Sequence, residues 1–153
     1  MLFNTSLWFH IIGISLMAGV TVADFVLTRK FWAFYVKSPQ EGILVRKISN
    51  KLPVLIIAGI LLILLSGVGM MIATHGVFDT FLWFRIKMGL VLLVILNAVI
   101  FGRRQNTQLN KLLLKEIPEE QLLKRIQKNL NTFHITQLTL FAFIYLLSTF
   151  KFN

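Results

Sequence analysis

The chain has 153 residues, which is about the size of one domain. Hydrophobic residues make up 56% of it, charged residues only 14%, and the mean hydropathy is +0.75. Soluble domains carry roughly a quarter of charged residues, so this composition excludes a cytosolic enzyme, a secreted disulfide scaffold and a disordered tail. The sequence contains no cysteine, which excludes thiolate metal sites and cysteine nucleophiles.

Four apolar stretches follow one another along the chain, at about residues 2–27, 53–74, 81–101 and 132–150. Each has roughly the 20 residues that a helix needs to cross a hydrocarbon core. The bilayer offers no water to backbone polar groups, so each span should be helical. We therefore expect an all-α integral membrane four-helix bundle in one domain, residues 1–153, with amphipathic connections at 30–52 and 102–131.

The first span carries a polar stripe through an otherwise apolar segment. Its members are separated by 7, 11 and 14 residues and so return to nearly the same side of a helix: His10, Met17, Thr21 and Asp24. We expect this face to point into the bundle, where His10 either donates to a neighbouring helix or binds a cofactor. A second stripe of small residues, Ser15, Gly19 and Ala23, predicts a close approach of helices. The span lacks a basic leader and is expected to be retained.

Both long connections contain helix signals. Ser38, Pro39 and Glu41 are typical of a helix start, and Pro118 with Glu119 and Glu120 indicates another. Leucines recur at helical spacing on either side of Pro118. We expect an amphipathic hairpin whose basic face either contacts anionic lipid headgroups or is simply solvated.

Basic residues predict the orientation of the bundle. The formal charge is +10, and 13 of the 16 Lys and Arg residues lie between spans one and two or between spans three and four. The positive-inside rule then predicts an up-down-up-down bundle with both termini outside. In a membrane protein this charge indicates topology and lipid contact rather than nucleic-acid binding. The tryptophans at predicted span ends, Trp8, Trp32 and Trp83, suggest an aromatic belt.

Spans three and four contribute the remaining polar groups. Arg85 and Lys87 lie just inside the third span beside Trp83, where they either snorkel to the interface or hold an anionic ligand such as a porphyrin propionate. His134 opens the fourth span at the depth expected for Asp24, so the two could pair. Asn97 and Gln137 are expected to make interhelical hydrogen bonds.

Methionines near the outer end of the bundle favour a different chemistry. Met71 and Met88 lie in the outer halves of their spans, and His75 follows Met71 by four residues. Thioethers with an imidazole suit copper(I), with His10 as a further ligand, but methionine is also common membrane filler. His75 is otherwise an ordinary histidine in a surface loop.

Two short motifs carry a family resemblance. The first span reads LWFHIIGISLMAG, with His10 near its start, and the third begins WFRIKMGLVLLVILN, with Trp83 and Lys87 four residues apart. This resembles the small bacterial membrane protoporphyrinogen IX oxidase family, and also the copper-resistance D-type membrane domain and related four-helix proteins. A glycine late in the second span would match Gly67 or Gly69. The family's histidine inside the third helix has no counterpart, because Asn97 lies near that level. His75, Met71 or Met88 could substitute as the second haem ligand, or the haem could be five-coordinate or absent.

The resemblance implies a haem-b-binding oxidoreductase of a bacterial cytoplasmic membrane, with His10 as an axial ligand. Porphyrin or quinone would be partners, and Arg85 and Lys87 would hold propionates or an anionic substrate. No catalytic residue is assigned. A copper-handling protein and a cofactor-free accessory subunit remain as alternatives, and the small-residue faces allow a homodimer without requiring one.

Overall fold

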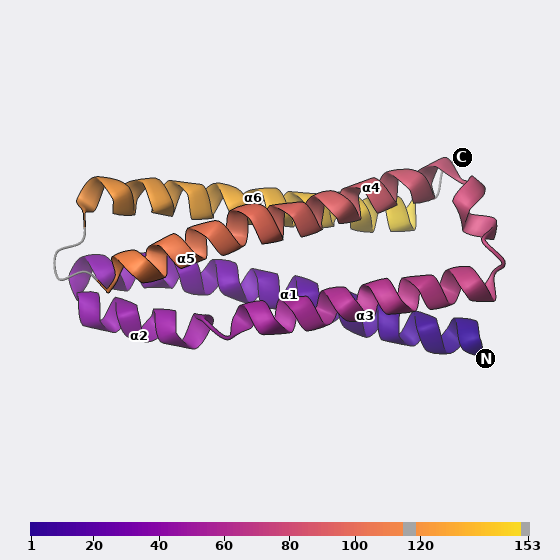
Figure 1. Cartoon of the computed structure of the whole chain (residues 1–153), viewed down its shortest axis with the longest axis horizontal. Helices are drawn as coiled ribbons and strands as arrows, with labels where there is room; N and C mark the ends of the chain where they lie inside the picture. Colours follow the sequence, from indigo (N-terminus) through magenta and orange to yellow (C-terminus); the bar gives the residue numbers. More distant parts are fainter. Residues whose placement is uncertain (115–118, 151–153) are drawn as a thin grey trace.

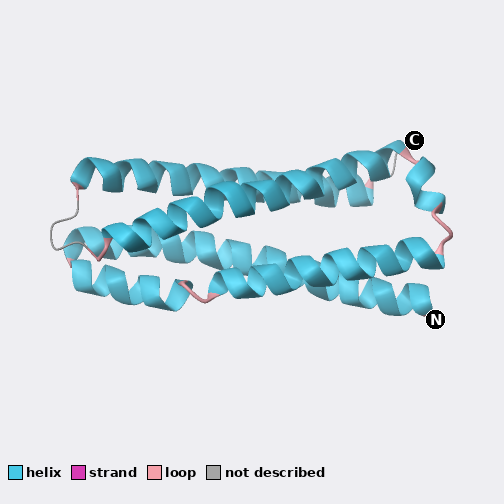
Figure 2. Ribbon diagram, in the orientation of Figure 1, coloured by secondary structure: helices cyan, strands magenta, loops and turns pink. Residues whose placement is uncertain are grey.

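The chain folds into a series of helices that follows the expected order. The computed structural model describes residues 1–114 and 119–150, and every regular element in those ranges is helical (Figure 2). The elements are α1 (Leu2–Lys37), α2 (Pro39–Ser49), α3 (Leu52–Ala73), the 3₁₀ turn η1 (Val77–Thr80), α4 (Leu82–Leu96), the π-helical turn η2 (Asn97–Gly102), α5 (Arg103–Leu112) and α6 (Glu120–Thr149). The predicted all-α class is confirmed for these residues.

Four of the helical stretches are long and apolar enough to cross a membrane: Leu2–Lys37, Pro39–Ala73, Leu82–Leu112 and Glu120–Thr149. Most of their side chains lie on the outside of the bundle. Leu65 on α3, for example, leaves 71% of its surface uncovered. An outer surface of this kind is stable against lipid tails rather than water. The protein is therefore a multi-pass membrane protein, as the four apolar stretches predict.

The long helices lie lengthwise beside one another (Figure 1). The start of α1, the end of α6 and the turn η1 lie at one end, which we call the termini end. The last turns of α1, together with α2, α5 and the start of α6, lie at the other end, which we call the basic end because it carries most of the Lys and Arg residues.

Two pairs of helices build the bundle. α1 packs along α3 and also against α2, α4 packs against α6, and the two halves meet where α1 contacts α6. Gly13 of α1 and Gly59 of α3 form a close backbone contact, since a Cβ on Gly13 would lie 3.0 Å from the Gly59 carbonyl oxygen. The prediction that Gly19 lies at a close contact is wrong: Ser15, Gly19 and Ala23 face outward, and a Cβ on Gly19 would meet nothing within 4 Å.

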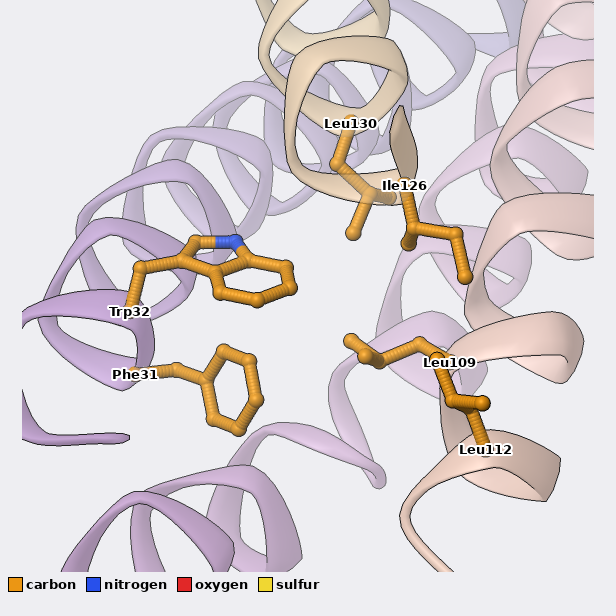
Figure 3. Packing of buried hydrophobic residues seen from close by; sticks show 6 residues of the cluster. All are labelled: Phe31, Trp32, Leu109, Leu112, Ile126 and Leu130. Atoms are coloured by element: carbon orange, nitrogen blue, oxygen red, sulfur yellow. The ribbon is translucent and has the colours of Figure 1, made fainter. Parts of the chain in front are cut away.

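Two apolar clusters fill the interior. Midway along the bundle, each of the four spans contributes one buried side chain: Met17, Ile63, Val94 and Phe141. At the basic end, Phe31 and Trp32 of α1 pack with Leu109 and Leu112 of α5 and with Ile126 and Leu130 of α6 (Figure 3). Trp32 of this cluster and Trp83 of α4 are both buried, so of the three tryptophans only Trp8 has the exposed position expected in an aromatic belt.

The helices continue beyond the apolar stretches. α1 runs without a break to Lys37, about 15 Å past the expected end of the first span at residue 27. The predicted helix start at Ser38 is confirmed, because Pro39 opens α2, although no side-chain cap bond forms there. α6 begins at Glu120, as expected, whereas Pro118 lies outside the described residues.

Candidate functional site

His10 lies in α1 near the termini end, where its ring is half-buried against α3. Its Nδ1 is 3.2 Å from the carbonyl oxygen of Ile63 and 3.0 Å from the hydroxyl of Ser66. The predicted inward stripe is confirmed as well, since Met17, Thr21 and Asp24 are buried along the same side of α1. The inward side of α1 therefore places His10 against the Ile63 carbonyl and the Ser66 hydroxyl of α3.

The partners of Nδ1 determine which ring nitrogen of His10 carries the proton. The Ile63 carbonyl can only accept a hydrogen bond, and the Ser66 hydroxyl donates to the carbonyls of its own helix. Nδ1 must therefore carry the hydrogen and donate it, which leaves the lone pair of a neutral ring on Nε2. Metal-bound histidines in proteins are commonly held in this way, with one nitrogen donating to a carbonyl and the other free to bind.

The imidazole of His10 has room beside Gly67 of α3 and lies near a cation of α4. A Cβ placed on Gly67 of α3 would lie 3.9 Å from Cε1 of the imidazole, and one on Gly69 would collide with Ser6. Lys87 of α4 lies close enough for its positive charge to act on the ring. Two predicted site residues, His10 and Lys87, are thus brought into one region. Arg85, two residues before Lys87 on α4, is exposed, and Trp83 is buried.

The residues proposed for copper do not gather in the same way. Met71 is half-buried near the end of α3, and His75 is exposed in the left-handed conformation at φ 52°. Met88 belongs to α4, which runs apart from α3 at the termini end (Figure 1). Within residues 1–114 and 119–150, no group of three or more His, Cys, Asp or Glu side chains could hold a metal ion.

The second intramembrane histidine forms the pair that the sequence predicts. His134 Nε2 lies 3.0 Å from Asp24 Oδ2, and its Nδ1 lies 2.7 Å from the Leu130 carbonyl oxygen. His134 exposes only 1% of its surface, and Asp24 is buried with it. The expectation that these two residues meet at the same depth is confirmed.

Hydrogen-bond chemistry fixes the charge of this pair. The Leu130 carbonyl accepts, so Nδ1 of His134 carries a hydrogen, and one further proton must lie between Nε2 and the Asp24 carboxyl. Whether that proton sits on nitrogen or on oxygen, the pair has no net charge. A neutral pair avoids the large cost of an isolated charge in the bilayer.

Amide side chains join the second half of the bundle. Asn97 of η2 donates to the Gln137 side-chain oxygen at 2.7 Å and to the Phe133 carbonyl at 3.3 Å. Gln137 in turn donates to the Val94 carbonyl, so the predicted interhelical role of Asn97 and Gln137 is confirmed.

The sequence reasoning missed two polar contacts. Ser66 was not singled out, although it is the one hydroxyl in the middle of a very apolar span. The buried Arg46 of α2 donates to Asn106 at 2.7 Å and to Asn110 at 3.0 Å on α5. The spacing of four between the two asparagines was the available signal, because it places both on one helical face.

No family model, curated protein or solved structure matches this chain.

Proposed function

We propose that this protein is a haem-b-binding membrane oxidoreductase in which His10 Nε2 is an axial ligand. One observation carries the proposal: His10 Nδ1 is committed to the Ile63 carbonyl and the Ser66 hydroxyl, so the ring is oriented and its Nε2 lone pair is available. His134 lacks this property, since both of its ring nitrogens are engaged.

The residues around His10 are compatible with a flat, anionic macrocycle. Gly67 leaves the side of the imidazole uncrowded, and the charge of Lys87 reaches the ring. Lys87 and Arg85 are the groups that we propose to bind the propionates, because a cation at the membrane boundary pairs well with a carboxylate. Haem b would supply one-electron redox chemistry when bound.

The proposed haem has one histidine ligand from this chain. The third span presents Asn97 where the family that the sequence resembles has a histidine, and Asn97 is occupied with Gln137 and Phe133. His10 would therefore be the residue of this chain that holds the haem, with Lys87 and Arg85 binding its propionates. A porphyrinogen substrate and a quinone acceptor follow from the resemblance to the protoporphyrinogen oxidases.

An absorption spectrum of the purified protein tests the proposal. Protein expressed with ample haem should show a Soret band when oxidised and sharper α and β bands when reduced with dithionite. His10→Ala should abolish or shift these bands, whereas the matched control His75→Ala should leave them unchanged. A featureless spectrum would overturn the proposal, and metal analysis would then decide between copper handling and an accessory role.

We also propose a location and an orientation: a bacterial cytoplasmic membrane, an up-down-up-down path, and both termini outside. The basic residues at one end, with the start of α1 and the end of α6 at the other, support this orientation under the positive-inside rule. Since the chain has no cysteine, Thr80→Cys and Lys111→Cys give single exposed labels at opposite ends. An impermeant thiol reagent added to intact cells should label only the first, and the reverse result would invert the orientation.

A further inference from the structure

A groove runs between α1 and α6 at the basic end, with a volume of about 670 Å³. Four of its lining residues are cations: Arg29, Lys37, Lys124 and Lys128. Within the described residues, no carboxylate lines it, although Glu120 pairs with the exposed Lys124 at 2.8 Å from outside the groove. A groove with this charge favours an anionic occupant.

The wall of the same groove contains a buried donor without an acceptor. Trp32 exposes only 8% of its surface, and its Nε1 is the one buried side-chain nitrogen or oxygen in the described part of the chain that has no hydrogen-bond partner. Figure 3 shows the indole nitrogen on the side of the ring that faces α6. Leaving such a group unpaired is unfavourable. Because the nitrogen itself is covered, a bound acceptor oxygen would satisfy it once the indole ring turns toward the groove.

The position of the groove indicates the kind of anion. It extends along α1 from Phe25 to Lys37, or about 18 Å, from the apolar span to the charged end. On the side of the groove nearer the termini end, the same helix faces carry exposed apolar side chains, Val22 on α1 and Ile135 on α6. These side chains extend both walls of the groove. An occupant that fills both parts has a charged head and an apolar tail.

We propose that this groove binds the headgroup of an anionic phospholipid from the leaflet at the basic end. The phosphate lies among Arg29, Lys37 and Lys128, one acyl chain lies over Val22 and Ile135, and the Trp32 indole turns toward the groove so that its Nε1–H donates to a phosphate or glycerol oxygen. Basic pockets between transmembrane helices bind acidic headgroups by this chemistry. The site is separate from His10 and does not depend on the proposed haem.

Native mass spectrometry of the full chain in detergent tests the proposal with dioleoyl-phosphatidylglycerol against dioleoyl-phosphatidylcholine as probes. We expect one tight phosphatidylglycerol per chain and roughly tenfold weaker binding in Arg29→Gln/Lys128→Gln. The control Arg103→Gln/Lys111→Gln removes two exposed cations of α5 that do not line the groove and should retain binding. Trp32→Phe keeps an aromatic ring, removes the donor and should weaken binding several-fold.

Three results would overturn the proposal. Equal binding of the two lipids would show that the anionic headgroup is not recognised. An equal loss in the control variant would assign the preference to general charge. Displacement of phosphatidylglycerol by millimolar inorganic phosphate would identify a soluble phosphate ligand. The thermal stability of each variant, measured without added lipid, distinguishes loss of binding from loss of folding.

Discussion

Two histidines lie inside the same bundle, and the partner of the second ring nitrogen distinguishes them. Both donate from Nδ1 to a backbone carbonyl, His10 to Ile63 and His134 to Leu130. His134 Nε2 then meets Asp24, whereas the structure describes no hydrogen bond at Nε2 of His10. The comparison teaches that the partner of the second nitrogen decides whether a membrane histidine is a fixed structural group or an available ligand.

The surroundings of the two residues agree with these roles. The His134 pair is buried between α1 and α6, the contact that joins the two halves of the bundle. His10 is only half-buried and lies on the α1–α3 contact, close to the termini end. A change at His134 should therefore affect the whole fold, and a change at His10 mainly its own site.

The largest expected effect is at the buried pair. His134→Leu leaves the Asp24 carboxyl without its partner, and loss of one member of a buried pair is typically unfavourable by about 3–5 kcal/mol. The free energy of unfolding in mixed micelles measures this loss. The double variant Asp24→Leu/His134→Leu removes both polar groups and should recover most of the stability. A double variant as unstable as the sum of the single ones would contradict the role of the pair.

The second largest effect is expected at Gly13, which lies at the contact of α1 with α3 three residues after His10. A Cβ at Gly13 would lie 2.9 Å from the Ile63 side chain and 3.0 Å from two backbone atoms of α3. Gly13→Ala should therefore force α1 and α3 apart and lower the free energy of unfolding by about 1–3 kcal/mol. Gly19→Ala is the matched control in the same helix, because its methyl group enters open space. Equal thermal stability of the two variants would show that the contact is not tight.

A smaller effect is expected at Ser66. Ser66→Ala removes one of the two acceptors of His10 Nδ1–H but leaves the Ile63 carbonyl, so we expect a loss of about 0.5–1.5 kcal/mol. Ser148→Ala serves as a control, since that hydroxyl donates only to the Ile144 carbonyl of its own helix. Chemical denaturation of both variants measures the difference. No difference between them would mean that Ser66 does not position His10.

The smallest effect is at the turn after α3. His75 has a positive φ of 52°, which is unfavourable for a residue with a Cβ and ordinary for glycine. His75→Gly should therefore change the free energy of unfolding by less than about 1 kcal/mol, toward greater stability. His75→Ala retains the strain and should not gain. A marked loss of stability in His75→Gly would show that the imidazole itself makes a contact that holds the turn.

Much of this arrangement could be predicted from residue patterns. The length and hydropathy of the apolar stretches were sufficient to predict the four spans, because a helix that crosses the bilayer needs about 20 apolar residues. The similar depth of Asp24 and His134 along their helices was sufficient to predict that they meet. The inward side of α1 followed from the spacing of its polar residues, which is a property of one helix alone.

What could not be predicted depends on which helices are neighbours. Gly13 lies on the same side of the helix as His10 and Met17, and Gly19 lies on the opposite side, but only the crossing of α1 over α3 shows that Gly13 meets Gly59. The groove beside Trp32 likewise exists only because α1 lies next to α6. The contact of Arg46 with two asparagines of α5 also joins segments about 60 residues apart. Hydropathy does not encode such pairings, since every span is apolar on its lipid-facing side.

The π-helical turn of residues 97–102 lets the third span hold one residue more than a regular helix would between α4 and α5. A π turn holds about one more residue than an α turn, so its side chains advance by less than the roughly 100° per residue of an α-helix. Deleting one residue after Asn97 should therefore restore a regular helix while Val94, Asn106 and Asn110 stay on the same sides of it. Inserting one residue in the regular part of α4 should instead rotate α5 by about 100° and move both asparagines away from Arg46. We expect this six-residue stretch to tolerate the loss of one residue far better than the regular helix beside it tolerates a gain.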